Sequence, residues 1–227
     1  MQVNDHDVRR QDDKVRLVGC NKLFGRAWIA THMPMGLPMK CLVFYGTAEG
    51  HTLKIARNIS EMIESAGHEV RLQDAYKRVA DIGLGEFDAF VAAAPVHQQR
   101  HPDAVIDFIK VHAASLNALP SALVSVSLAA AFEGGHRDAQ AYVDRLLERT
   151  GWRPTAVHLA AGALNSQKYD YFQEQIIRHV VLKDREPDDI VGDHDFTDWD
   201  ALAQFVKDFE VASSAVKSVP GAGGSFP

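Results

Sequence analysis

The sequence predicts an α/β fold in which a parallel sheet of five strands carries helices on both faces. Short apolar runs alternate with longer amphipathic segments from residue 40 onward. This alternation is typical of parallel strands that are joined by right-handed helical crossovers. Hydrophobic residues make up 46% of the 227-residue chain, which suits one domain with a substantial core.

The five predicted strands differ in how far they are buried. The runs CLVFY and FDAFVAAAP are apolar except for Asp88, as expected for strands that are covered on both faces. The run HEVRLQ alternates between polar and apolar residues, which indicates a partly exposed strand. The strands are predicted at 41–45, 68–73, 87–95, 121–129 and 155–164.

The helices are predicted from apolar spacing and from residues that begin or end helices. Ile55, Ile59 and Ile63 fall on one face of the first helix, which Gly67 ends. Pro102 suits the start of the second helix. The helices are predicted at 52–67, 102–116, 137–151 and 198–212.

The domain is predicted to span residues 39–212. Residues 1–38 show no sustained period and are interpreted as a leader or over-extended N-terminus, which we expect to be disordered. The small-residue tail, 213–227, is also expected to be disordered. Residues 165–197 form an insertion before the last helix that is too long for an ordinary connection.

Composition excludes several classes of function. The formal net charge of −6 argues against a nucleic-acid partner. The two cysteines, Cys20 and Cys41, form no CxxC or Cys/His cluster, so we expect no disulfide framework, no metal site and a reducing cytosol. No run of about 18 apolar residues suggests a helix that spans a membrane.

Ligands of such sheets bind where the parallel strands end, so the loops after the strands are the places to search. The first loop, GTAEGHT, runs from a strand into a helix. Thr47, Gly50 and Thr52 suit a phosphate-binding loop, because they supply hydroxyls, close backbone approach and helix N–H groups. Gly50 and Thr52 also suit an ordinary capped turn, and both interpretations remain open. The loop lacks the Walker lysine and the GxGxxG spacing.

The spacing T-x-x-G-x-T matches the phosphate loop of flavodoxins, except that Glu49 stands where a hydroxyl is usual. A carboxylate repels a phosphate. If Glu49 points outward, however, it lends only its backbone N–H and leaves the anion to Thr47, Thr52 and the helix dipole.

Two further loops are expected to flank a planar ligand. Pro95, Val96 and His97 follow the third strand, although His97 is equally interpretable as an exposed loop histidine. His101 is assigned to the start of the next helix. The backbone that begins at Ser127 follows the fourth strand. The candidate cofactor-binding residues are Thr47, Ala48, Glu49, Gly50, His51, Thr52, Pro95, Val96, His97, Ser127, Leu128, Ala129 and Ala130.

Residues 39–212 resemble the menaquinone-dependent protoporphyrinogen IX dehydrogenases, a long-chain flavodoxin-like family. The resemblance lies in TAEGHT, KVHAASLNALPSALVSVSL, WRP, AGAL and TDW, which occur in matching order. It implies a flavodoxin-like three-layer fold with strand order 2-1-3-4-5. It also implies an FMN enzyme of heme biosynthesis that passes electrons from protoporphyrinogen IX to a quinone. The insertion is implied to lie near the flavin edge and to recognise the substrate or the membrane.

The chain departs from this family where specificity is expected. Its second loop, APVHQQRH, retains only His101 from the family pattern. Residues 165–196 hold four basic and eight acidic residues, a net charge of −4 that suits porphyrin propionates and anionic lipid poorly. Within them, residues 171–184 are predicted to form an amphipathic helix that packs on the domain or contacts a membrane.

Three functions therefore remain in view. The first is an FMN oxidoreductase of the protoporphyrinogen dehydrogenase kind, with flavin chemistry and no assigned catalytic side chain. The second is a flavodoxin-type electron carrier or FMN quinone reductase with another small-molecule donor. The third is a flavodoxin-like module without flavin. Each is expected to be cytoplasmic, with at most peripheral contact with the cell membrane.

Overall fold

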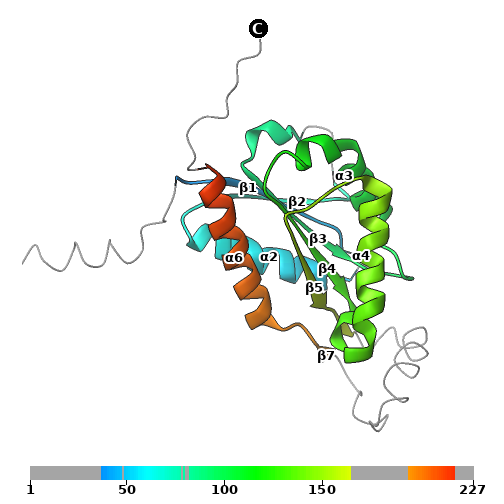
Figure 1. Cartoon of the computed structure of the whole chain (residues 1–227). Helices are drawn as coiled ribbons and strands as arrows, with labels where there is room; N and C mark the ends of the chain where they lie inside the picture. Colours follow the sequence, from blue (N-terminus) through cyan, green and yellow to red (C-terminus); the bar gives the residue numbers. More distant parts are fainter. Residues whose placement is uncertain (1–36, 48, 78, 80–81, 165–193, 218–227) are drawn as a thin grey trace, which may run out of the picture. The chain divides into compact units, whose positions relative to one another are not determined.

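The computed structural model describes residues 37–47, 49–77, 79, 82–164 and 194–217. Its five-stranded parallel sheet has the order β2-β1-β3-β4-β5, which confirms the predicted fold class (Figure 1). The strands are β1 (Lys40–Tyr45), β2 (Glu69–Asp74), β3 (Ala89–Pro95), β4 (Ser121–Ser127) and β5 (Ala156–Ala161).

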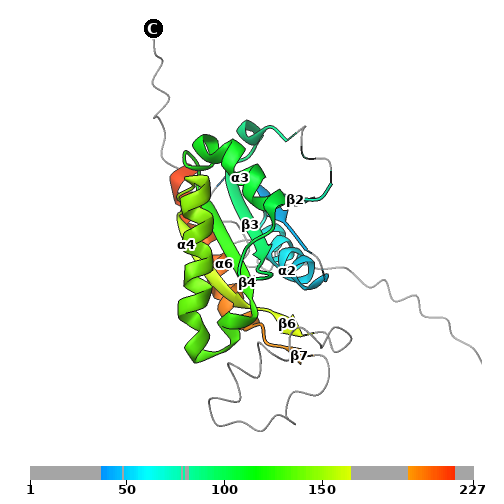
Figure 2. The same cartoon turned by 90° about the vertical axis from the view of Figure 1, so that its right-hand side faces the viewer.

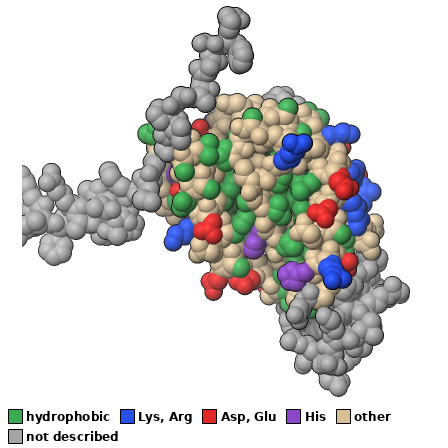
Figure 3. Space-filling model, viewed as in Figure 1, with side chains coloured by type: hydrophobic (Ala, Val, Ile, Leu, Met, Phe, Trp, Pro, Cys, Tyr) green, Lys and Arg blue, Asp and Glu red, His purple; other side chains and the backbone are tan. Residues whose placement is uncertain are grey.

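Burial explains which strands lie in the middle of the sheet. Every residue of β3 and β4 is buried, and β1 is buried from its second residue onward. The edge strands β2 and β5 are only partly covered. Figure 3, viewed as in Figure 1, shows hydrophobic side chains over the middle of the face between α4 and α6, while charged side chains lie mainly toward its sides.

Four α-helices of the described chain cover the two faces of the sheet. One face carries α2 (His51–Ser65) and α6 (Trp199–Lys217), whose apolar residues share a core with β1, β3 and β4. The other face carries α3 (Asp103–Leu116) and α4 (His136–Thr150) (Figures 1 and 2). None of these helices is long and apolar enough to span a bilayer.

The predicted fifth strand is wrong at its end. The parallel strand β5 stops at Ala161, and residues 163–164 form a second short strand, β6 (Ala163–Leu164). This strand pairs antiparallel with β7 (His194–Asp195), as Figure 2 shows. Gly162 marks the break, because its N–H still bonds to the β4 end at Ser127 while its carbonyl accepts from Phe196. His194 and Asp195, near the end of the predicted insertion, therefore belong to this two-stranded antiparallel sheet, which we call the β6–β7 hairpin.

The predicted last helix ends too early. Residues 213–217 were assigned to a disordered tail, yet α6 continues to Lys217. Ser213 and Ser214 are buried, and their hydroxyls bond to the Phe209 carbonyl at 2.7 Å and to Glu210 at 3.2 Å. These bonds satisfy the hydroxyls within the helix, so the small polar residues do not end it.

The domain core begins at Met39, which is 3% exposed and donates its N–H to His68 at 3.3 Å. Residues 1–36 of the predicted leader, residues 218–227 of the predicted tail, and the predicted amphipathic helix at 171–184 lie outside the described residues.

Candidate functional site

The first loop joins β1 to α2 through a left-handed glycine. Gly50 has φ +91°, a conformation that residues with a Cβ rarely adopt, and it donates its N–H to the Thr47 hydroxyl at 2.9 Å. Glu49 is exposed, as its predicted outward orientation requires. Ala48, also predicted to contact the cofactor, lies outside the described residues.

Thr52 is the residue of this loop that best fits an anion. It lies in the first turn of α2 and is only 3% exposed. Its hydroxyl forms no hydrogen bond with any residue that the structure describes. A buried hydroxyl without a partner is unusual, and here it lies beside helix N–H groups that have no acceptor within the helix. These features suit a bound phosphate better than an ordinary capped turn.

The second loop is a tight hairpin. His97 and Arg100 exchange both backbone hydrogen bonds, at 3.0 and 3.1 Å, across Gln98 and Gln99. Both glutamines have positive φ, which costs energy for residues other than glycine. Arg145 of α4 donates to the Gln99 carbonyl at 3.0 Å. The half-buried His97 therefore lies on a fixed turn at the end of β3.

His101 has a structural place in the core. It is 2% exposed, and its Nε2 lies 2.9 Å from the Ser125 hydroxyl on β4. Burial lowers its pKa to about 4, so the ring is neutral at pH 7. It precedes α3, as predicted, but it contributes to packing beneath the loop.

The third loop packs its backbone closely against the start of α4. Ser127 is followed by a 3-10 turn at Leu128–Ala131, and its hydroxyl accepts from the Ala130 N–H at 3.3 Å. A Cβ on Gly135 would lie 2.1 Å from the Ala129 carbonyl oxygen, so only glycine fits. This fixes the predicted ring-flanking backbone from Ser127 to Ala130.

The strand register brings the three loops to one edge. Tyr45 at the end of β1 lies opposite Ala93, and Pro95 at the end of β3 lies opposite Val126. Because β2 and β3 flank β1 on opposite sides, the order in which strands are added to the sheet reverses beside the first loop. This is the topological switch point at which open α/β sheets bind ligands.

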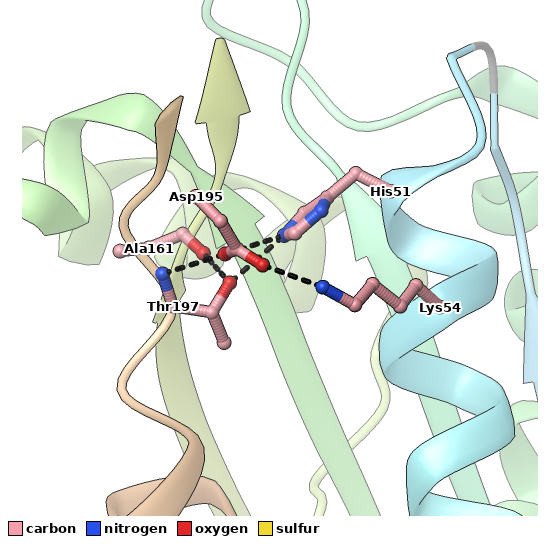
Figure 4. Close-up of polar contacts among 5 residues, drawn as sticks. All are labelled: His51, Lys54, Ala161, Asp195 and Thr197. Atoms are coloured by element: carbon pink, nitrogen blue, oxygen red, sulfur yellow. Dashed lines mark hydrogen bonds and ion pairs between the residues drawn. The ribbon is translucent and has the colours of Figure 1, made fainter. Parts of the chain in front are cut away.

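A fourth segment reaches this edge, and its contacts were not predicted. Thr197 donates its hydroxyl hydrogen to the Ala161 carbonyl at 2.9 Å and lies 2.8 Å from His51 Nε2. Asp195 accepts from the Thr197 N–H at 3.0 Å and from Lys54 at 2.8 Å. Figure 4 shows these residues converging from α2, β5 and the segment before α6. We call them the His51–Thr197 network.

The network is arranged to hold one charged carboxylate and one neutral imidazole. Burial raises the pKa of Asp195, but hydrogen bonds from Lys54 and Thr197 outweigh it and lower the pKa to about 2. Burial lowers the pKa of His51, against the opposing effect of Asp195. Asp195 is therefore ionised at neutral pH, whereas His51 is neutral.

A surface groove of about 480 Å³ adjoins the first loop. It runs along the outer side of α2 and contains no residue of the second or third loop. Its lining is Gly50, Leu53, Lys54, Arg57, Asn58, Glu61 and Trp199.

Comparison with known proteins identifies relatives of this chain by sequence. The chain is 28% identical over 186 residues to a protoporphyrinogen IX dehydrogenase (quinone) of Leishmania major, covering 80% of this chain and 79% of the relative. It is 26% identical over 171 residues to the Escherichia coli K12 protein of the same name, covering 75% and 94% respectively. These similarities confirm the resemblance found in the sequence.

Solved structures that are similar to this chain include a short-chain flavodoxin associated with a bacterial microcompartment. It has a TM-score of 0.48 and 13% identity, and the match covers 78% of this chain and 99% of the flavodoxin. The family assignment rests on a family model. The model of the flavodoxin domain matches residues 42–190, more than half of the chain. The chain therefore belongs to the flavodoxin domain family.

Proposed function

We propose that this chain is an FMN-dependent oxidoreductase that passes electrons from protoporphyrinogen IX to a quinone. Both curated relatives described above carry the name of that activity, and the match covers most of each protein. The three loops at the carboxyl edge supply a phosphate-binding turn and two fixed backbone segments. Bound FMN would supply the redox chemistry, accepting electrons from the donor and delivering them to the quinone.

The observation that carries the cofactor assignment is the hydroxyl of the buried Thr52, which has no hydrogen-bond partner among the described residues. Thr52, Thr47 and the first-turn N–H groups of α2 would hold the FMN phosphate, while the loops at Pro95–His97 and Ser127–Ala130 would flank the ring. The first loop contains no basic residue. Neutral hydroxyls and helix N–H groups suffice to bind a phosphate, because the helix dipole favours negative charge at this end.

We assign no side chain as a catalytic acid or base. Three titratable residues near the loops are engaged in other interactions: His51 bonds to Thr197, His101 bonds to Ser125, and Asp195 is paired with Lys54. The role we propose for the protein is therefore to bind the cofactor, to orient its ring and to position the donor. We also propose a cytoplasmic location with at most peripheral membrane contact, where a membrane quinone is within reach.

The charge of the insertion supports a second candidate. Residues 165–196 carry a net charge of −4, which repels the propionates of a porphyrinogen. A flavodoxin-type electron carrier, or an FMN quinone reductase with another donor, would not need to bind propionates. This alternative keeps the same cofactor site and changes only the donor.

The test begins with the purified full-length protein. Flavin released by denaturation is identified by chromatography, and we expect FMN. The flavin-loaded protein is then supplied, without oxygen, with protoporphyrinogen IX and menaquinone, and protoporphyrin fluorescence is followed. We expect turnover that requires both reactants. FMN without turnover would favour the carrier or quinone reductase, whereas failure to bind any flavin would refute both.

A further inference from the structure

His51 connects two parts of the candidate site that are far apart in the sequence. It is the first residue of α2, directly after the phosphate-loop glycine, and its ring contacts Thr197 across 146 positions. Thr197 follows the β6–β7 hairpin, which lies at the end of β5. The His51 side chain is 17% exposed, so the contact is largely shielded from water.

The direction of this hydrogen bond follows from the number of available protons. The Thr197 hydroxyl has one hydrogen, and the Ala161 carbonyl, which can only accept, lies 2.9 Å away. The hydroxyl oxygen must then accept from His51, which requires a proton on Nε2. The lowered pKa of His51 leaves the ring with that single proton at neutral pH.

The same hairpin is tied to the third loop. Phe196 donates its N–H to the Gly162 carbonyl at 3.2 Å, and the Gly162 N–H bonds to the Ser127 carbonyl at 3.1 Å. The rings of Phe196 and Phe132 also lie 5.9 Å apart. A continuous series of contacts therefore runs from the first turn of α2, through Thr197, to the backbone that flanks the proposed ring site.

We propose that His51 is a positioning residue that couples phosphate binding at the first loop to the placement of the β6–β7 hairpin and the third loop. The proposal rests on the proposed function, because it assumes that the first loop binds the cofactor phosphate. Fixing the His51 ring also fixes the first turn of α2, whose N–H groups would bind the FMN phosphate. By linkage, phosphate binding must stabilise the hairpin to the same extent.

Riboflavin separates this coupling from a general effect on stability, because it has the same ring as FMN but no phosphate. His51→Leu removes the donor, and His51→Gln keeps a side-chain N–H. Thr197→Val removes the acceptor by a second route. His136→Leu is the matched control, since His136 is also the first residue of a helix and is exposed. Dissociation constants for FMN and riboflavin are measured by flavin fluorescence, with thermal unfolding as a check of folding.

We expect His51→Leu and Thr197→Val each to weaken FMN binding roughly five- to tenfold, the range of one lost hydrogen bond. Riboflavin binding should not change. His51→Gln should recover most of the FMN affinity, and the double variant should be no weaker than either single variant. Hydrogen exchange should show that FMN protects the Phe196 and Thr197 amides in the wild type but not in His51→Leu.

Three results would overturn the proposal. An unchanged FMN-to-riboflavin affinity ratio in both His51→Leu and Thr197→Val would show that the contact does not act on the phosphate. An equal loss in His136→Leu would show that the effect is not specific to the network. Failure of the wild type to bind either flavin would refute the proposed function, and the coupling with it.

Discussion

Replacing Thr52 with valine should affect the empty and the FMN-bound protein in opposite directions. The two side chains have almost the same shape, and valine lacks the hydroxyl. In the structure Thr52 is 3% exposed, and its hydroxyl has no partner among the described residues. The change therefore removes an unsatisfied polar group from the empty protein and a proposed phosphate ligand from the complex.

The expected magnitudes follow from these two roles. Burying a hydroxyl without a partner costs about 1–3 kcal/mol, so Thr52→Val should leave the stability of the flavin-free protein unchanged or raise it. A hydrogen bond to a charged group contributes roughly 1.5–3 kcal/mol, so FMN should bind about ten- to a hundredfold more weakly. Riboflavin, which has no phosphate, should bind as it does to the wild type.

The assay combines urea unfolding of flavin-free protein with titration of FMN and riboflavin. Thr47→Val serves for comparison, because the Thr47 hydroxyl already accepts from Gly50 at 2.9 Å. Its loss should destabilise even the flavin-free protein by about 1 kcal/mol, the usual net contribution of one hydrogen bond. Wild-type FMN affinity in Thr52→Val would show that this hydroxyl does not contact the phosphate.

Three further predictions concern other parts of the domain. Burial lowers the pKa of His101 to about 4, so as the pH falls from about 6.5 to 4 the unfolded chain takes up a proton that the folded protein excludes. The free energy of unfolding, measured with urea, should therefore fall by roughly 3 kcal/mol over this range. An equal fall in His101→Gln would contradict this assignment. Trp152→Ala should cost about 3–5 kcal/mol, because the ring is 1% exposed, packs on Phe90 and donates to Ser121 at 3.0 Å; the ratio of FMN to riboflavin affinity should stay unchanged, and a shift in it would place Trp152 in the site. Replacing residues 165–193 by a short Gly/Ser link, which joins Leu164 to its partner His194, should preserve FMN binding and abolish protoporphyrinogen turnover; full turnover would remove the insertion from substrate recognition.

The sheet was predictable because burial leaves a clear pattern in its strands. The three inner strands are almost completely buried and hold mostly apolar residues, since helices cover both of their faces. The edge strand β2 mixes polar and apolar residues because it is only partly covered. The ends of β5 and α6 were predicted wrongly. The break at Gly162 and the serine hydroxyls that bond within α6 depend on hydrogen bonds of the folded chain. The periodicity of the sequence does not show such bonds.

The loops of the candidate site were predictable from their positions after the strands. The role of Thr197 was not, because its contact with His51 forms only when the fold brings the segment before α6 beside α2 and the Ala161 carbonyl at the end of β5. The available indication was the short TDW motif, which contributed to the family resemblance without any assigned role. His101 was likewise a loop residue in the sequence, and only the packing of Ser125 beneath it reveals a buried pair.

The most direct test of the account follows the bound flavin through one cycle. Flavin-loaded protein is mixed without oxygen with protoporphyrinogen IX, and absorbance is recorded near the flavin band at about 450 nm. We predict that the band bleaches as protoporphyrin fluorescence appears, and that added menaquinone restores it. A flavin that stays oxidised with protoporphyrinogen IX, yet is reduced by a different donor and reoxidised by the quinone, would contradict the proposed substrate.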